Sequence, residues 1–403
     1  MFTRRAAALL PALAFTSPAA ARVSDDVVRI GVLNDQSGIY ADIGGQGSVV
    51  AARMAVEEFG GTVLGKPIDV IFGDHQNRPD VGSVIARRWI DLEKVDAIVD
   101  VPSSATALGV LNVTREKNRM LLLSGPGSSD FTGKQCSPTS VHWTYDTYAM
   151  ANGTARALVQ QGGDTWFFVT ADNAGSHSQE RDATEFVKRA GGRVLGSVRH
   201  PIATSDFSSF LLQARGSRAK VIGLANAGND TVNAIKQAKE FGITQGGQKL
   251  AALLMFISDI HAIGLADAQG LVFTDAFYWD ANDKTRGWSK RFMERHGGRA
   301  PTSAQAGVYG AVLHYLKAIR DAGTDEPAVV ARRMKELPVN DFWSENFRIR
   351  QDGRLVRDMY LFEAKKPSES KGPWDYYKVL ARVPGDEAYR PMSEGGCPLA
   401  NQN

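Results

Sequence analysis

The sequence predicts an α/β protein made of two successive doubly wound lobes, each a mainly parallel sheet with helices on both faces. Short strands rich in β-branched residues alternate with amphipathic helices, which is typical of βαβ units. The alternation restarts after Tyr145, so the chain is divided into two similar halves. The chain has 403 residues, enough for two domains that each build a core.

In the first half, four strands are expected, and polar loops or helices separate them. The first strand precedes a glycine-rich loop over residues 34–47, and the last one ends at Gly125-Pro126-Gly127-Ser128. The expected strands are residues 27–33, 68–72, 97–101 and 120–124, and the expected helices are residues 48–59, 80–93 and a segment from Ser104 to Lys117.

The second half repeats the pattern, and a C-terminal third follows it. In that third, Asp352-Gly353 lies between two alternating runs, residues 347–350 and 359–362, which predicts a hairpin. The tail after Lys366 is expected to be irregular. The other expected strands are residues 165–170, 193–200, 221–224, 250–256 and 270–276, and the helices are residues 149–161, 178–189, 207–215, 231–241, 282–297 and 303–322.

The first residues predict export. Arg4 and Arg5 precede a short apolar run over residues 6–15, and Ala19-Ala20-Ala21 is a cleavage site of small residues. This order is typical of a secretory signal peptide, residues 1–21. The apolar run is too short to span a bilayer, which takes about 20 residues. We therefore expect a periplasmic protein with a cleaved signal peptide.

The net charge of the chain bears on which classes of partner it can bind, and its cysteines bear on disulfide formation. The net charge is +3, and Arg4 and Arg5 supply two of those charges. A chain so close to neutrality after cleavage is not expected to bind nucleic acid or an anionic membrane surface. Cys136 and Cys397 are the two cysteines, and in an exported protein they predict one disulfide, with two buried thiols as the alternative.

Motifs of catalysis are missing from the sequence. It contains no GxSxG, Walker A, HExxH or clean GxGxxG motif after the first strand. The seven histidines are scattered without the i, i+4 spacing of a metal-binding helix. We expect neither an enzyme, nor a cofactor, nor a metal site. The alternative of a periplasmic hydrolase or amidase needs a nucleophile–base pair that we do not find.

Small polar segments recur where a predicted strand ends and a helix begins. In open α/β sheets, ligands bind outside these strand ends, and helix N-termini suit a carboxylate. Any one segment also fits simple helix capping, but four in two matched halves favour a site between the lobes. The four segments are Pro102-Ser103-Ser104, Gly125-Pro126-Gly127-Ser128, residues 172–176 and residues 225–229.

The sequence resembles the branched-chain amino acid (Leu/Ile/Val) type of periplasmic solute-binding protein. No single motif is specific, but the ordered set covers nearly all of the chain after the signal peptide. The resembling segments are Val28-Arg29-Ile30-Gly31-Val32, Ser37-Gly38-Ile39-Tyr40, Leu64-Gly65-Lys66-Pro67-Ile68, Val101-Pro102-Ser103-Ser104, Ser124-Gly125-Pro126-Gly127-Ser128, Thr170-Ala171-Asp172, Ala238-Lys239-Glu240-Phe241-Gly242 and Asp352-Gly353-Arg354.

This resemblance implies a type I periplasmic binding fold, in which two Rossmann-like lobes joined by three crossovers clamp a ligand. The implied N-terminal lobe is residues 27–144 plus 276–358, and the C-terminal lobe is residues 145–275 plus 359–385, followed by a tail at 386–403. The implied function is the substrate-binding component of an ABC importer, which works as a monomer with a permease in the inner membrane. The same fold also serves ligand sensing for a receptor, which is the alternative function.

The resemblance and the strand ends together give the candidate ligand-binding residues. The first lobe is expected to hold a carboxylate, and the second to close over it, with aromatic side chains near the crossovers. The candidates are Ile43, Ser103, Ser104, Pro126, Gly127, Ser128, Tyr145, Asn173, Ala174, Gly175, Ala227, Gly228, Phe256 and Tyr278.

Two departures from the family pattern bear on the ligand. Gly175 stands where amino-acid-binding members carry an aromatic side chain, and Phe256-Ile257 stands where they carry an acid for the ammonium group. A buried ammonium group needs an acceptor. We therefore expect a carboxylate without an α-ammonium group, with an aromatic acid ahead of an aliphatic one. If an amino acid binds instead, Asp259 or Asp230 is expected to take its ammonium group.

Overall fold

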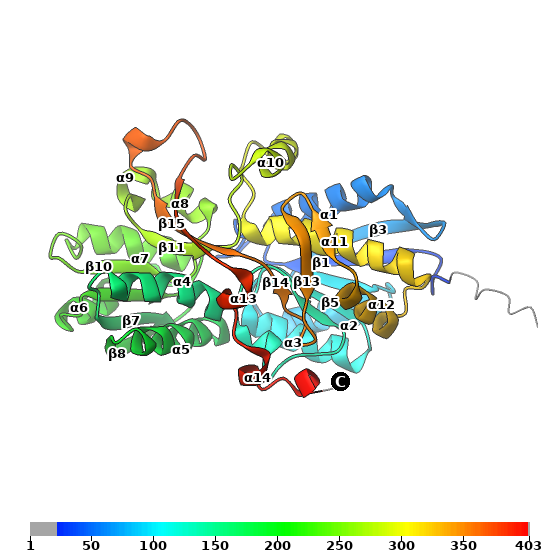
Figure 1. Ribbon diagram of the computed structural model, residues 1–403, viewed down its shortest axis with the longest axis horizontal. Helices are drawn as coiled ribbons and strands as arrows, with labels where there is room; N and C mark the ends of the chain where they lie inside the picture. The colour runs from blue at the N-terminus through cyan, green and yellow to red at the C-terminus, as the bar shows by residue number, and fades with distance from the viewer. Residues whose placement is uncertain (1–21, 402–403) are drawn as a thin grey trace, which may run out of the picture.

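The computed structural model describes residues 22–401, which form two lobes side by side, each built on its own sheet (Figure 1). The expected signal peptide, residues 1–21, lies outside the described residues. Mainly parallel strands with helices packed on both faces confirm the predicted α/β class and the two doubly wound lobes. Among residues 22–401, no helix combines the length and the apolar composition needed to cross a membrane.

The first lobe contains a six-stranded sheet. Its strands are β1 (Val28–Asn34), β2 (Thr62–Val63), β3 (Lys66–Asp74), β4 (Ala97–Asp100), β5 (Met120–Leu123) and β6 (Ser140–His142). In space they follow the order β2-β3-β1-β4-β5-β6, and all pairs are parallel except β2 with β3. The order reverses between β1 and β4, and ligands bind at such a switch point in open α/β sheets.

Helices cover both faces of this sheet because their apolar sides must be buried. α1 (Gly45–Phe59) and α11 (Ser303–Ala322) pack on one face, beside α12 (Pro327–Glu336). α2 (Pro79–Asp91) and α3 (Ser104–Glu116) pack on the other face. α10 also closes the first face, although its chain segment follows the second lobe; it spans Asp283–Arg295.

The second lobe contains a seven-stranded sheet. Its strands are β7 (Thr165–Ala171), β8 (Arg193–His200), β9 (Val221–Ala225), β10 (Lys249–Ala252), β11 (Val272–Asp275), β15 (Met359–Ala364) and β16 (Tyr377–Val383). The spatial order is β16-β15-β11-β10-β9-β7-β8. β7 to β11 are parallel, whereas β15 and β16 add an antiparallel edge. The switch point of this sheet lies between β7 and β9.

The helices of the second lobe again form two layers. One face carries two long helices, and the other carries three shorter ones. Short helices also lie in the connections and in the tail. The sheet-covering helices are α4 (Thr147–Gln160), α5 (Ala174–Arg189), α6 (Ser208–Gly216), α7 (Asn229–Glu240) and α8 (Ile257–Ile263), and the short ones are α9 (Leu265–Ala268), α13 (Gly385–Ala388), α14 (Met392–Gly395), η1 (Ser129–Thr132), η2 (Pro367–Glu369) and η3 (Pro398–Asn401).

The predicted C-terminal hairpin is wrong in its second arm. β12 (Val339–Asp341), β13 (Ser344–Ile349) and β14 (Leu355–Val356) form a small sheet of their own. The turn at Gly353, which has a φ of 87°, is tight, so β13 pairs with the residues directly after it. Residues 359–362 belong instead to β15 in the second lobe.

Two further expectations differ from the structure. The tail after Lys366 is not wholly irregular, because β16 pairs along the length of β15. The strand expected at residues 250–256 ends at Ala252, and Phe256 is already the N-cap of α8. After Ala252, Leu253 packs into the core of the second lobe, whereas Leu254 is buried among residues of both lobes.

Candidate ligand-binding site

A small cavity lies between the two lobes, at the carboxyl ends of the strands that flank both switch points. Its volume is about 20 Å³, room for about one water molecule, so little space is left between the lobes there. Its lining comes from the loops after β1, β4, β5, β7, β9 and β10 and from the crossover before α4. The lining residues are Tyr40, Ile43, Pro102, Ser104, Gly125, Gly127, Tyr145, Asn173, Gly175, Ser176, Gln179, Ala227 and Leu254.

The first lobe presents the start of α3 to this cavity. Ser103 is the N-cap of α3, and its hydroxyl oxygen accepts a hydrogen bond from the Thr106 N–H at 3.4 Å. Ser104 follows and lines the cavity; its hydroxyl oxygen accepts from the Ser128 N–H at 3.2 Å. A helix N-terminus carries free N–H groups and a partial positive charge. This end of the cavity therefore suits an anionic or strongly polar group.

A strained turn delivers Pro102 and Ser104 to the cavity. Asp100 and Val101 both have left-handed backbones, with φ values of 82° and 53°. A β-branched residue in this region is a genuine outlier that costs about 1–3 kcal/mol. The turn is held because Val101 donates its N–H to Leu33, and the Asp100 carboxylate accepts from the Asn34 amide at 2.9 Å. Burial raises the pKa of Asp100 to about 6.

The second lobe contributes the start of α5. Asn173 caps this helix by accepting a hydrogen bond from the Ser176 N–H at 3.0 Å. Gly175 faces the first lobe, where a Cβ atom would lie 3.0 Å from the Ser104 hydroxyl oxygen. Even a methyl group at position 175 would require Ser104 to give way by a few tenths of an ångström. The N-termini of α3 and α5 therefore converge on one cavity from opposite sides.

Gly228 provides the other close approach between the lobes. It has a φ of 59°, and a Cβ atom there would lie 2.3 Å from the Ile39 carbonyl oxygen. The next residue, Asn229, donates its N–H to the same oxygen at 3.3 Å. Glycine is required here both for the backbone conformation and for the contact. Gly228 therefore supports closure of the lobes rather than lining the cavity.

The aromatic residues divide into two groups. Tyr145 lines the cavity and is fixed by donating its hydroxyl to the Gly125 carbonyl at 2.6 Å. Phe256 packs behind it, with ring centroids 5.6 Å apart, and does not line the cavity. Tyr278 lies in a separate aromatic pocket of about 220 Å³ and donates its hydroxyl to Asp375. Tyr278 is thus not placed to stack on a ligand in the cavity.

Every residue that lines the cavity is uncharged. The acids nearest in sequence to the expected ammonium site are engaged elsewhere. Asp259 accepts the Phe256 N–H at 2.9 Å, and Asp230 accepts the N–H groups of Ala203 and Thr204. Burial raises the pKa of Asp259 to about 7 and that of Asp230 to about 6. Neither carboxylate lines the cavity in this arrangement.

A polar cluster beside the cavity bridges the lobes. Asp182 of α5 is fully buried. Its carboxylate accepts hydrogen bonds from Ser129 at 2.7 Å and Thr147 at 2.6 Å. It also accepts from Arg181 at 3.0 Å and from Arg390 of the tail at 2.9 Å. A buried carboxylate is stable only when its acceptor sites are filled, so this cluster stabilises the closed arrangement.

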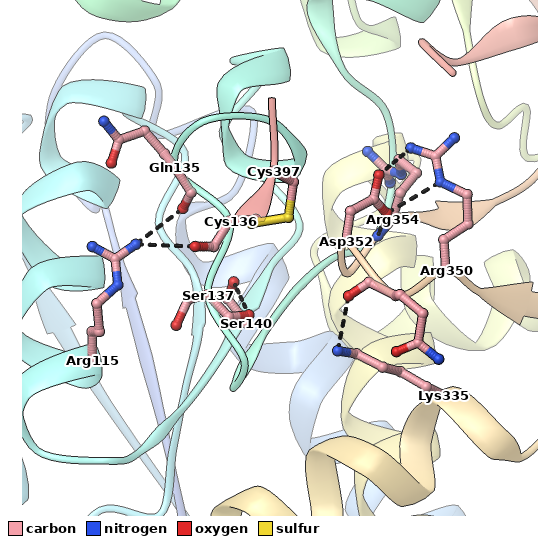
Figure 2. Close-up of a disulfide and its surroundings, with 11 residues drawn as sticks. Arg115, Gln135, Cys136, Ser137, Ser140, Lys335, Arg350, Asp352, Arg354 and Cys397 are labelled. Atoms are coloured by element: carbon pink, nitrogen blue, oxygen red, sulfur yellow. Dashed lines mark hydrogen bonds and ion pairs between the residues drawn. A yellow bond between two sulfur atoms is a disulfide. The ribbon is translucent and has the colours of Figure 1, made fainter. Parts of the chain in front are cut away.

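The tail is fixed to the first lobe by a Cys136–Cys397 disulfide, which confirms the predicted pairing (Figure 2). The Cα atoms are 5.7 Å apart, and the bridge spans 261 residues in sequence. Figure 2 shows Arg115 of α3 donating to the carbonyl groups of Gln135 and Cys136, both at 3.2 Å. These bonds fix the loop that carries the first sulfur. The tail residue Arg390 is thereby anchored close to Asp182.

Comparison with known proteins agrees with this geometry. A family model described as "Periplasmic binding protein" matches residues 27–372. The chain belongs to this family. Members of the family bind small solutes outside the cytoplasm and deliver them to the permease of an ABC importer.

Individual relatives place the chain with the branched-chain amino acid type, as the sequence resemblance indicates. A Leu/Ile/Val-binding protein homolog of Brucella melitensis is 26% identical over 71% of this chain and 72% of its own length. A periplasmic binding protein of Burkholderia mallei is 50% identical, with a TM-score of 0.91 over 93% of this chain and 99% of its own. A branched-chain amino acid ABC transporter ligand-binding protein of Burkholderia xenovorans is 37% identical, with a TM-score of 0.83 over 93% of this chain and 100% of its own.

The cavity brings together half of the candidate residues of this periplasmic binding protein. The candidates that line it are Ile43, Ser104, Gly127, Tyr145, Asn173, Gly175 and Ala227. The other candidates lie beside or away from the cavity; they are Ser103, Pro126, Ser128, Ala174, Gly228, Phe256 and Tyr278. Several of these have local roles, such as Ser128, whose hydroxyl caps η1 by accepting from the Asp130 N–H.

Sequence reasoning did not select Ser176, which ends a quoted strand-end segment, and missed three lining residues outside those segments, Tyr40, Gln179 and Leu254. Tyr40 belongs to a family segment but was not selected as a ligand contact. Ser176 and Gln179 follow Gly175 on α5, and the spacing of four between Gly175 and Gln179 places both on one helix face. Leu254 occupies the place expected for Phe256, two residues earlier, because β10 is shorter than predicted.

Proposed function

We propose that this chain is the substrate-binding component of an ABC importer that closes on a small carboxylate, with an aromatic acid preferred over an aliphatic one. It acts in the periplasm after removal of residues 1–21, as a monomer, and passes its ligand to an inner-membrane permease without chemical turnover. The observation that carries the ligand class is the uncharged lining of the cavity, since an α-ammonium group would be left without an acceptor.

The carboxylate is proposed to lie at the Ser104 end. The hydroxyl of Ser104 and the N-terminal N–H groups of α3 and α5 supply hydrogen bonds and partial positive charge. Tyr145, Leu254 and Ile43 supply apolar and aromatic walls for the rest of the ligand. An aromatic acid is larger than 20 Å³, so side chains of the lining rearrange around it while the contact of Gly228 with Ile39 is kept.

Closure is proposed to occur by a hinge at three crossovers, near residues 144–145, 275–276 and 358–359, which we take as the limits of the lobes. Gly175 and Gly228 permit the final approach, and the Asp182 cluster stabilises it. Proteins of this fold from Rhodopseudomonas palustris are described in complex with 4-hydroxybenzoate and with benzoate, and one from Thermotoga maritima is described as a leucine binding protein. The fold thus accommodates both ligand classes, and the lining residues decide between them.

A thermal-shift screen followed by calorimetry tests the proposal. A ligand at 100 times its Kd adds about 2.7 kcal/mol to the free energy of unfolding, so benzoate-like acids are expected to raise Tm clearly. Leucine and valine serve as the contrasting ligands, because they differ by carrying an ammonium group. Tight binding of leucine or valine without binding of any benzoate-like acid would contradict the proposed ligand class.

A further inference from the structure

Gln179 is a buried polar side chain that the closed structure leaves without a partner. It lies on α5, its residue is only 4% exposed, and it lines the cavity between the lobes. Its side-chain oxygen Oε1 is buried and has no hydrogen-bond partner among residues 22–401. Buried amide oxygens in folded proteins are nearly always paired, and an unpaired one is unfavourable.

The neighbours of Gln179 on α5 are all engaged. Asn173 caps the helix, Ser178 contacts Thr147, and Asp182 accepts four hydrogen bonds. Gln179 stands between these groups, on the same helix face as Gly175, which approaches Ser104. The two positions are one helical turn apart, about 5–6 Å between Cβ positions. The unpaired amide therefore comes from one helical turn further along α5 than the approach of Gly175 to Ser104.

From this position we propose that Gln179 is a specificity-determining residue that pairs with a second, neutral polar group of the ligand, such as a hydroxyl. The assignment rests on the proposed function, because it takes the carboxylate to lie at Ser104. A carboxamide offers an acceptor and two donors, so it suits a hydroxyl or an amide group. The carboxamide of Gln179 carries no charge, so the group that we place against it is uncharged. The ligand class becomes a small hydroxylated or amide-bearing carboxylate rather than a plain hydrocarbon acid.

Matched acids test this assignment directly. Isothermal titration calorimetry would compare benzoate with the monohydroxybenzoates on the wild-type protein. One additional buried hydrogen bond is expected to tighten the binding of at least one hydroxylated isomer about three- to tenfold. In Gln179→Met, which keeps the length of the side chain but removes the amide, this preference is expected to disappear. Benzoate is titrated on the same variant, and the readout is the ratio of the two affinities.

A control variant separates specificity from stability. Gln160→Met makes the same chemical change at an exposed position of α4, and it should retain the preference for the hydroxylated acid. Gln179→Met should keep or raise Tm, because an unpaired buried amide is removed. A lower Tm with an unchanged preference would overturn the assignment and mark Gln179 as a structural residue.

The remaining outcomes distinguish the two proposals. If benzoate and every hydroxylated isomer bind the wild-type protein equally, only the assignment of Gln179 is overturned, and the carboxylate site stands. If none of these acids binds at all, both the ligand class and the assignment are overturned.

Discussion

Gly228 controls how closely the two lobes can approach, and its substitution tests the closing motion. In Gly228→Ala, the added Cβ atom would lie 2.3 Å from the Ile39 carbonyl oxygen and 3.1 Å from a ring carbon of Tyr40. Both neighbours belong to the other lobe. The overlap therefore exists only when the lobes are closed, whereas in an open form position 228 faces the cleft.

The size of the effect follows from this geometry. A carbon atom cannot remain 2.3 Å from an oxygen atom, so one lobe must shift, and overpacking of this kind costs about 1–3 kcal/mol. Because a ligand held by both lobes binds only the closed form, the cost is subtracted from its binding free energy. The expected loss of affinity is about 5- to 150-fold. The left-handed φ of 59° adds strain in both forms, so it lowers Tm without changing Kd.

Gly270→Ala is the matched control. This glycine is also in the second lobe and has a φ of 80°, but no heavy atom lies within 4 Å of its added Cβ. It should lower Tm and leave the affinity unchanged. Calorimetry with whichever acid raises Tm in the screen, together with the radius of gyration from small-angle X-ray scattering, reports both affinity and closure. If Gly228→Ala binds that acid within twofold of the wild type, the reasoning about closure is refuted.

Three further predictions concern the hydroxyl of Ser104, the disulfide of the C-terminal tail and the buried carboxyl group of Asp275. Ser104→Ala should weaken binding of a carboxylate by about 1.5–3 kcal/mol, the value of a charge-assisted hydrogen bond, and unchanged calorimetric affinity would place the carboxylate elsewhere. Non-reducing mass analysis should find no alkylatable thiol in the native protein, and reduction of Cys136–Cys397 should cost up to about 5 kcal/mol. Burial raises the pKa of Asp275 to about 7 from its usual 3.8, so the folded state holds this proton between about pH 4 and 7 when the unfolded state has lost it. The contribution of Asp275 to stability is therefore lost as the pH rises through that window. Relative to the wild type, the free energy of unfolding of Asp275→Asn should increase from pH 4 to pH 7 by up to about 4 kcal/mol, and its Tm should rise accordingly. A difference in Tm that stays constant with pH would contradict this.

The sequence predicted the sheets better than it predicted what lies between them. Strand–helix alternation is a local property, so β1, β4, β5, β7 and β9 were located to within one or two residues. The predicted pairing of β13 was wrong because the runs at 347–350 and 359–362 have the same alternating pattern. The first run belongs to the small sheet beside the first lobe, and the second run belongs to the sheet of the second lobe. Nothing local distinguishes a hairpin arm from a strand that joins a distant sheet.

The prediction of the candidate site was limited for the same reason, because sequence patterns report only local structure. Strand ends located Ser104, Gly127 and Ala227 because parallel strands bring their carboxyl ends to one edge. Tyr278 follows β11, which lies beyond β10 and away from the switch point, so its strand end does not reach the cavity. Gln179 lies inside a helix, and its role depends on which face of α5 meets the other lobe. That fact belongs to the closed arrangement and not to any sequence window.

The Cys136–Cys397 bridge also determines how the molecule responds to mechanical force. Residues 136–397 form one covalent ring that contains the whole second lobe. Tension applied to the chain on either side of the ring passes through the two sulfur atoms and does not stretch the segments within it. Extension is then confined mainly to residues 22–135, where β1 to β5 can be pulled apart. Force applied to the ends of the oxidised chain would therefore unfold the first lobe while the second stays folded. After reduction of the disulfide, the same force would act on both lobes.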